Sequence, residues 1–144
     1  AIDGADGRRI TVEGFVSSGL QAVEAVDAAH DPDLWVVALG TNDVGQYATD
    51  EQYRAAIDAV LDELPDDDGP LVWVDVFLDG SEQRCEDFNR VLREALDARG
   101  NATIVNWSLL AGQDGMLVDG VHPGSVGIEV FAELVAGGVG RWLR

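Results

Sequence analysis

The chain has no lysine, one cysteine and no long hydrophobic run. Nine arginines stand against 27 acidic residues, which gives a net charge of −18. Such a surface repels phosphate backbones, so the charge argues against nucleic acid as a partner. The single cysteine, Cys85, allows no intrachain disulfide and no cysteine-based zinc cluster, and we interpret it as structural. No apolar stretch approaches the roughly 18 residues that a membrane helix needs.

The composition is that of an ordinary globular domain. The 144 residues are 47% hydrophobic and 25% charged, with no internal repeat, low-complexity tract or linker. We therefore expect a single domain over residues 1–144, with a core of its own. The acidity fits solubility or a salt-tolerant source and identifies no substrate. The sequence leaves the compartment unknown, and a secreted or extracytoplasmic location is compatible with it.

Short apolar runs alternate with longer amphipathic segments along the chain. We expect strands at 34–39, 71–77 and 102–105, and helices at 12–29, 50–64, 81–99 and 125–143. Strands that alternate with helices predict an α/β fold with a parallel sheet covered by helices on both faces, a three-layer α/β/α arrangement. Ligands of such sheets lie beyond the carboxyl ends of the strands. Polar residues in those turns are therefore the candidate site.

Two turns carry residues suited to acyl transfer. Gly40-Thr41-Asn42-Asp43 follows an apolar strand, and it places the amide of Asn42 at the lip of the sheet. Far downstream, Asp119-Gly120-Val121-His122 puts an aspartate three residues before a histidine, a spacing that can supply an oriented base. A glycine-containing block, Asp3-Gly4-Ala5-Asp6-Gly7-Arg8, precedes the first expected helix.

In order and spacing these blocks resemble three of the four that mark the SGNH (GDSL-type) hydrolases, a superfamily of esterases, lipases, thioesterases and carbohydrate deacetylases. The resemblance implies a flavodoxin-like sheet, with His122 as general base, Asp119 as the residue that orients it, and Asn42 with Gly7 as oxyanion-hole donors. Gly4 competes with Gly7 for that role. The family needs no metal or organic cofactor, and it acts on small-molecule esters or acylated carbohydrates.

The family's first block, the Gly-Asp-Ser nucleophile at the end of the first strand, is not found in this chain. Two serines, Ser17 and Ser18, fall inside an expected helix, while Ser81 and Ser125 read as helix caps. Ser108, in the expected loop 106–119, is the one serine that merits a closer look. In the family the first strand lies mid-sheet, so we expect that strand and its serine to lie in an N-terminal segment or a complementary chain.

We therefore predict a serine esterase whose triad serine is outside the sequence, with little or no activity for this chain alone. The alternative is a non-catalytic binding or structural module that kept the fold and lost the nucleophile. A flavodoxin-like nucleotide domain is more remote, because no phosphate loop is present.

Asn42, Gly7 and His122 also have purely structural interpretations. We expect Asp43 to hydrogen-bond its own turn and His30 to be structural. A last set could form an acyl-binding wall or core: Trp107, Leu109, Leu110, Met116 and Leu117.

Overall fold

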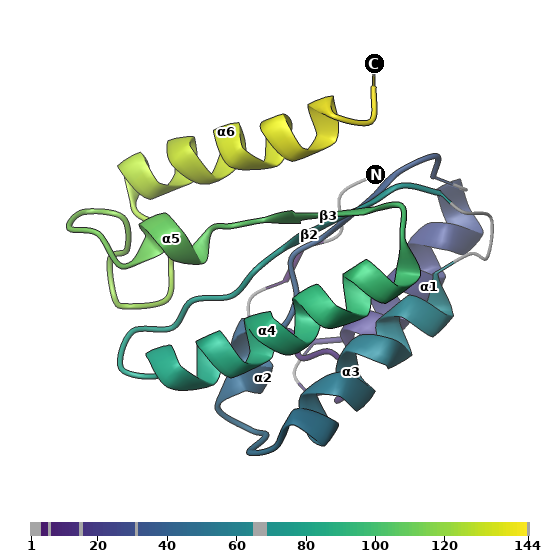
Figure 1. Ribbon diagram of the computed structural model, residues 1–144, viewed down its shortest axis with the longest axis horizontal. Helices are drawn as coiled ribbons and strands as arrows, with labels where there is room; N and C mark the ends of the chain where they lie inside the picture. The colour runs from purple at the N-terminus through teal and green to yellow at the C-terminus, as the bar shows by residue number, and fades with distance from the viewer. Residues whose placement is uncertain (1–3, 6, 15, 31, 65–68, 144) are drawn as a thin grey trace.

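The computed structural model describes residues 4–5, 7–14, 16–30, 32–64 and 69–143. Its elements follow the expected alternation of helices and strands (Figure 1). They are α1 (Gly19–His30), β1 (Trp35–Val37), α2 (Thr41–Val44), α3 (Asp50–Glu63), β2 (Leu71–Val74), α4 (Glu82–Arg99), β3 (Ala102–Val105), α5 (Ser108–Ala111) and α6 (Ser125–Gly140).

The three strands form one parallel sheet in the order β1-β2-β3. Trp35 lies opposite Leu71, and Trp73 lies opposite Ile104. Each parallel connection passes through a helix, α3 after β1 and α4 after β2, as parallel pairing requires. This architecture confirms the predicted α/β class. Within the described residues the sheet ends at β1, whose second edge has no neighbouring strand.

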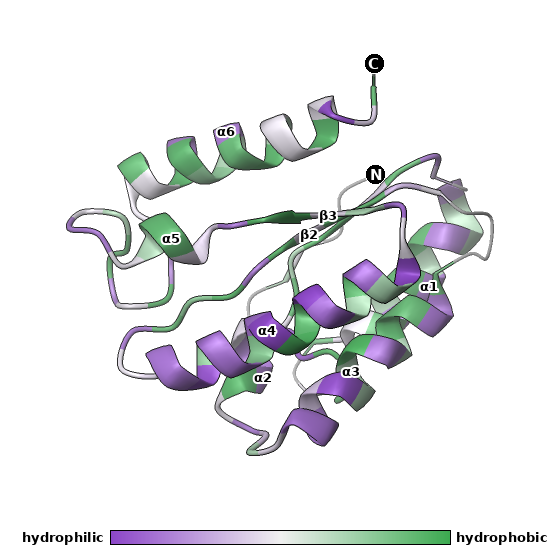
Figure 2. Ribbon diagram, viewed as in Figure 1, coloured by the Kyte–Doolittle hydropathy of each residue, from purple (hydrophilic) through white to green (hydrophobic). Residues whose placement is uncertain are grey.

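Helices cover both faces of the sheet (Figure 1). On one face α1, α3 and α4 enclose a core around Trp73, Tyr53 and Phe88, each at most 2% exposed. The rings of Tyr53 and Phe88 meet edge to face with centroids 5.5 Å apart. Figure 2 shows apolar residues on the inner sides of these helices and polar residues on the outer sides. This is the larger of the two cores.

The second core lies between the sheet and helices α5 and α6. Trp107 is 5% exposed there, and its ring packs edge to face on Phe131 at 5.4 Å between centroids. This settles one open question, because Trp107 is a core residue, whereas Leu109 is 72% exposed. Met116 and Leu117 pack against the same cluster. Among the residues expected to form an acyl-binding wall or core, Leu109 is the one that is largely exposed to solvent.

The expected helix 12–29 begins later, at Gly19, and the reason is a local capping box. Ser18 N–H donates to Gln21 Oε1 at 2.8 Å, and Gln21 N–H donates back to Ser18 Oγ at 3.2 Å. This reciprocal pair starts the helix at Gly19. Ser18 is therefore a cap, not an interior residue. Thr11, the residue before the expected helix 12–29, shares a hydrogen bond with Tyr47 at 3.0 Å.

The other boundaries follow the prediction more closely. Helix α3 begins at Asp50, capped by Thr49 and Gln52, and α4 covers 82–99, although the Ser81 side chain makes no cap hydrogen bond. The strands expected at 34–39 and 71–77 are shorter, and the last helix ends at Gly140. Two four-residue helices, α2 and α5, lie where turn and loop were expected.

Candidate active site

The turn after β1 depends on Gly40. Its φ of 123° lies in a region that residues with a side chain rarely adopt. A Cβ at Gly40 would also lie 2.5 Å from the Phe88 ring. The missing side chain therefore lets the chain turn directly above the core. The next residues begin α2 and include Asn42 and Asp43.

Asp43 is fully buried and binds a distant segment of the chain. Its two carboxylate oxygens accept the backbone N–H of Ile10 at 3.2 and 3.0 Å. Burial raises the pKa of Asp43 to about 6, although the Ile10 N–H and the charge of Arg9 act in the opposite direction. The prediction that this side chain bonds its own turn was wrong, because its partner is 33 residues away.

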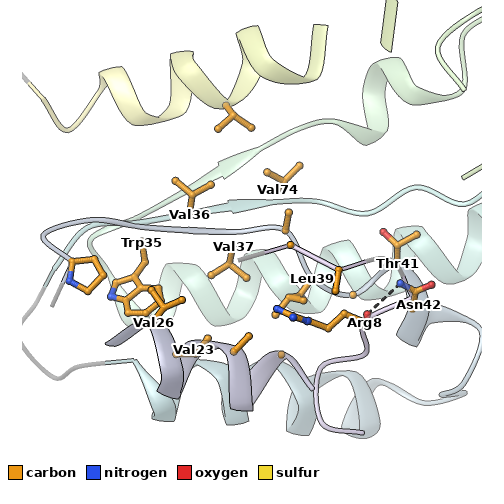
Figure 3. A pocket seen from close by; sticks show the side chains of 18 of the residues that line it. Arg8, Val23, Val26, Trp35, Val36, Val37, Leu39, Thr41, Asn42 and Val74 are labelled. Carbon is orange, nitrogen blue, oxygen red and sulfur yellow. Dashed lines mark hydrogen bonds between the residues drawn. The ribbon is translucent and has the colours of Figure 1, made fainter. Parts of the chain in front are cut away.

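Asn42 contacts the glycine block near the N-terminus. Its Nδ2 donates to the carbonyl oxygen of Arg8 at 3.2 Å (Figure 3). Gly7, the preceding residue, has a φ of 74°, whereas Gly4 has no positive φ. The hydrogen bond therefore joins Asn42 to the residue that follows Gly7. An amide nitrogen carries two N–H groups, so the bond to Arg8 leaves the second N–H of Asn42 to meet a ligand.

Sequence reasoning did not single out Arg8. Its side chain is buried, with the residue 9% exposed, and one guanidinium nitrogen donates to Ser17 Oγ at 3.2 Å. A signal was available, because Arg8 directly follows the glycine of the block. Ser17 therefore has a structural role as the hydrogen-bond partner of Arg8.

Asp119 and His122 are in direct contact. Nδ1 of His122 lies 2.7 Å from Oδ2 of Asp119. Oδ1 of Asp119 accepts two backbone N–H groups, from His122 at 2.8 Å and from Val121 at 3.1 Å. These hydrogen bonds lower the pKa of Asp119 to about 2, the backbone N–H of His122 contributing most. The aspartate is therefore a carboxylate across the neutral pH range, and it holds one imidazole nitrogen.

The loop that carries this pair is attached to the sheet edge by backbone hydrogen bonds. The N–H of Asp79, in the connection between β2 and α4, donates to Gly120 O at 2.9 Å. Gly124 N–H donates to Met116 O at 2.8 Å, which closes the base of the loop. Asp119 and His122 therefore lie beyond the carboxyl end of β2, while Asn42 lies beyond that of the neighbouring β1.

A second buried carboxylate follows β2 directly. Asp75 accepts the backbone N–H of Ser108 at 2.7 Å and its hydroxyl at 2.6 Å. Burial raises the pKa of Asp75, and the Ser108 hydrogen bonds oppose the rise. Ser108 is thus held at the start of α5 as a structural residue. Sequence reasoning missed Asp75, although a carboxylate that directly follows four fully apolar strand residues was a usable signal.

A groove of about 930 Å³ runs beside β1 (Figure 3). It extends from Pro32 and Leu34 to Gly40, Thr41 and Asn42. Asp119 and His122 are not among the described residues that line it. In the same described ranges, no group of three or more His, Cys, Asp or Glu side chains is placed to hold a metal ion. None of the described helices is both long and apolar enough to cross a membrane.

A family model and several solved structures match this chain. The family model described as "GDSL-like Lipase/Acylhydrolase family" matches residues 2–130. A comparison with curated proteins found no match.

Solved structures share the fold at low sequence identity. The protein TesA is 23% identical, with a TM-score of 0.69 over 84% of this chain and 69% of its own. A carbohydrate esterase family 3 protein from Talaromyces cellulolyticus is also 23% identical, with a TM-score of 0.66 over 84% of this chain and 61% of its own. An acetyl xylan esterase from Geobacillus stearothermophilus is 19% identical, with a TM-score of 0.65 over 85% and 69%. At these identities the likeness shows the fold.

Proposed function

The chain belongs to the GDSL-like lipase/acylhydrolase family, and from this premise we propose that it is the His-Asp and oxyanion part of a serine esterase for short acyl esters. The resemblance to the SGNH (GDSL-type) hydrolases is confirmed, as is their α/β fold. The observation that carries the proposal is the 2.7 Å contact between His122 and Asp119 in a loop fixed at the carboxyl edge of the sheet.

In this proposal Asp119 accepts the Nδ1–H of His122 and fixes the tautomer of the ring. Nε2 is then the nitrogen that takes the proton of a serine hydroxyl as the serine oxygen attacks the acyl carbonyl. The imidazolium returns that proton to the leaving alcohol, and water releases the acyl group by the same steps. The lowered pKa of Asp119 supports this role, because the residue stays charged beside the imidazolium.

The developing oxyanion would be stabilised from the β1 side. Asn42 is exposed, and its Nδ2 is positioned by the bond to Arg8 O. Gly7 is the residue before Arg8, so the same hydrogen bond ties Asn42 to the segment that carries the second candidate donor. Loss of one such donor typically lowers turnover by about 10²–10³-fold. The proposal requires no metal or cofactor.

None of the serines with a described side-chain hydrogen bond is a candidate for the nucleophile. Ser17, Ser18 and Ser108 each have a structural hydrogen bond, to Arg8, Gln21 and Asp75 respectively. We propose that the nucleophile comes from a polypeptide segment beyond residues 1–144. An ester or acetylated carbohydrate is the substrate class that the esterase neighbours favour.

The test is hydrolysis of p-nitrophenyl acetate by the polypeptide in its natural length. His122→Ala should lower kcat/KM by at least about 10³-fold. Asn42→Ala should lower kcat by about 10²–10³-fold. The matched control is His30→Ala, since His30 is the exposed last residue of α1, and this variant should leave the rate unchanged.

The alternative function is a binding module without chemistry. Absence of ester hydrolysis, together with absence of a covalent adduct with a serine-directed phosphonate, would favour that alternative. The 144-residue chain alone is expected to show little or no turnover in either case.

A further inference from the structure

The two candidate catalytic side chains lie mostly in solvent. The side chain of His122 is 58% exposed and that of Asp119 is 53% exposed. Packing against a core therefore does not fix them, although catalytic groups need to be held within about 0.5 Å of their productive position. Their position has to come from the backbone of the loop and from the part of the domain that holds this loop at the sheet edge.

The base of the loop is closed by its own backbone. The N–H of Val118 donates to the carbonyl oxygen of His122 at 2.9 Å, and Leu117 pairs with Pro123 in an antiparallel bridge. These contacts hold the two sides of the loop together. They do not place its tip, Gly120, relative to the rest of the domain.

Asp79, in the connection between β2 and α4, meets that tip. In Figure 1 this connection lies at the same end of the sheet as the loop between α5 and α6. The N–H of Asp79 donates to the carbonyl oxygen of Gly120 at 2.9 Å. A Cβ added to Gly120 would lie only 2.9 Å from the Cβ of Asp79. Carbon atoms in contact are ordinarily about 3.5–4.0 Å apart, so a side chain here would push the tip outward by at least about 0.5 Å.

The connection that carries Asp79 is itself fixed by helix α4. Asn89 is 3% exposed, and its amide binds both backbone groups of Val76. Its Oδ1 accepts the N–H and its Nδ2 donates to the carbonyl oxygen, each at 2.9 Å. On the other side of Asp79, the N–H of Gly80 donates to Glu82 Oε1 at 2.9 Å. Two side chains of α4 therefore hold the connection on either side of Asp79.

We propose that Asp79 and Gly120 are positioning residues for His122, because their close contact sets where the histidine lies relative to the sheet edge. The inference rests on the proposed function, which gives the position of His122 its purpose. Neither residue is assigned a contact with substrate. Gly120 also joins Asp119 to the two N–H groups that its carboxylate binds, so a displaced Gly120 moves the aspartate relative to the imidazole.

The first test is the effect of Gly120→Ala on hydrolysis of p-nitrophenyl acetate by the natural-length polypeptide. A misplacement of about 1 Å can lower a rate by about 10²-fold. We therefore expect kcat to fall by about 10–10²-fold, with KM within about twofold of the wild-type value.

The matched control is Gly115→Ala. Gly115 lies in the same loop with a φ of 84°, compared with 85° for Gly120, but an added Cβ meets nothing within 4 Å. The two variants therefore share the backbone strain and differ in the contact with Asp79. Gly115→Ala should keep kcat within about twofold of wild type. An equal loss of kcat in both variants would overturn the inference.

Variants of Asp79 test whether the contact itself is the cause. Asp79→Gly removes the Cβ that the new methyl group would meet, whereas Asp79→Ala removes the carboxylate and keeps that Cβ. The loss caused by Gly120→Ala should remain about 10–10²-fold in the Asp79→Ala background and shrink to within about threefold in the Asp79→Gly background. Equal losses in the two backgrounds would contradict the proposed contact.

The titration of Asp119 gives a readout that does not depend on hydrolysis. Hydrogen bonds from the backbone N–H and ring of His122, and from the N–H of Val121, lower the pKa of Asp119 to about 2. These bonds depend on the backbone angles of Gly120. In an NMR titration of the carboxyl group, Gly120→Ala should raise this pKa toward its ordinary value of 3.8, and Gly115→Ala should leave it at about 2. An unchanged pKa in Gly120→Ala would contradict the displacement of the tip.

The outcomes separate the inference from the proposed function. A wild-type polypeptide that hydrolyses no ester would contradict the proposed function, and the titration of Asp119 would still decide whether the contact with Asp79 positions the pair. Hydrolysis with an unchanged kcat in Gly120→Ala would contradict the inference and leave the esterase function standing. Circular dichroism establishes that each variant is folded. If Gly120→Ala unfolds the protein, the same substitution in the Asp79→Gly background should fold, and an unfolded double variant would overturn the inference.

Discussion

The buried carboxyl of Asp43 gives a quantitative prediction for the pH dependence of stability. Asp43 is 0% exposed, and its pKa is raised from 3.8 to about 6 in the folded chain. A shift of roughly two units corresponds to about 3 kcal/mol, because one unit is worth about 1.4 kcal/mol. The folded state therefore favours the protonated side chain. This contribution to stability is present below about pH 4 and is lost as pH rises to about 6.

The perturbation is Asp43→Asn, which keeps an oxygen to accept the Ile10 N–H and cannot ionise. Urea denaturation at several pH values between about 4 and 7 gives the free energy of unfolding of both proteins. The difference between wild type and variant should shift by about 3 kcal/mol across this window, with the wild type losing stability relative to the variant as pH rises. A constant offset from the unpaired amide protons is expected in addition and does not depend on pH.

The comparison of wild type with Asp43→Asn removes the contribution of the other carboxyl groups. Asp75 also has a raised pKa, but it is present in both proteins and cancels in the difference. Asp119 has a pKa lowered to about 2, so its stabilisation is lost only below about pH 4. The matched control is Asp58→Asn, an exposed carboxyl paired with Arg54. A wild-type–variant difference for Asp43 that stays constant over the window, or changes with the opposite sign, would refute the reasoning.

Two glycine pairs test the packing of the site by urea denaturation. Gly127→Ala drives a methyl group into the Met116 carbonyl oxygen below the His122 loop and should lower the free energy of unfolding by about 1–2 kcal/mol. Gly137→Ala, in the same helix with nothing within 4 Å, should raise it by about 0.5–1 kcal/mol, and equal gains in both would contradict the contact. Gly40→Ala should cost about 2–5 kcal/mol through its positive φ and the ring beneath it. The control Gly45→Ala, with open space around it, should stay within about 0.5 kcal/mol, so similar losses would rule out the special role of the Gly40 turn.

The sequence predicted those parts of the fold that local patterns determine. The α/β class and the bounds of α3, α4 and β3 follow from helical periodicity, capping and short apolar runs. The start of α1 was misplaced because the reciprocal hydrogen bonds between Ser18 and Gln21, which begin the helix at Gly19, were overlooked.

The site divides in the same way. The contact between Asp119 and His122 spans three residues, so spacing alone suggests it. The bonds of Asp43 to Ile10 and of Asn42 to Arg8 span more than 30 residues and depend on how the chain returns to the sheet edge. The spacing of apolar residues along the sequence does not predict hydrogen bonds between residues so far apart. The groove beside β1 is likewise a property of the assembled layers, because α1, β1 and α6 all line it.

The measurement that tests the central claim most directly is the site of covalent attachment of a serine-directed phosphonate. The natural-length polypeptide is treated with the reagent and its adduct is located by peptide mass mapping. The account predicts one adduct, on a serine outside residues 1–144, that is lost in His122→Ala and absent when the 144-residue chain is treated alone. An adduct on Ser108 or on another serine within 1–144 would contradict the account, as would labelling that does not depend on His122.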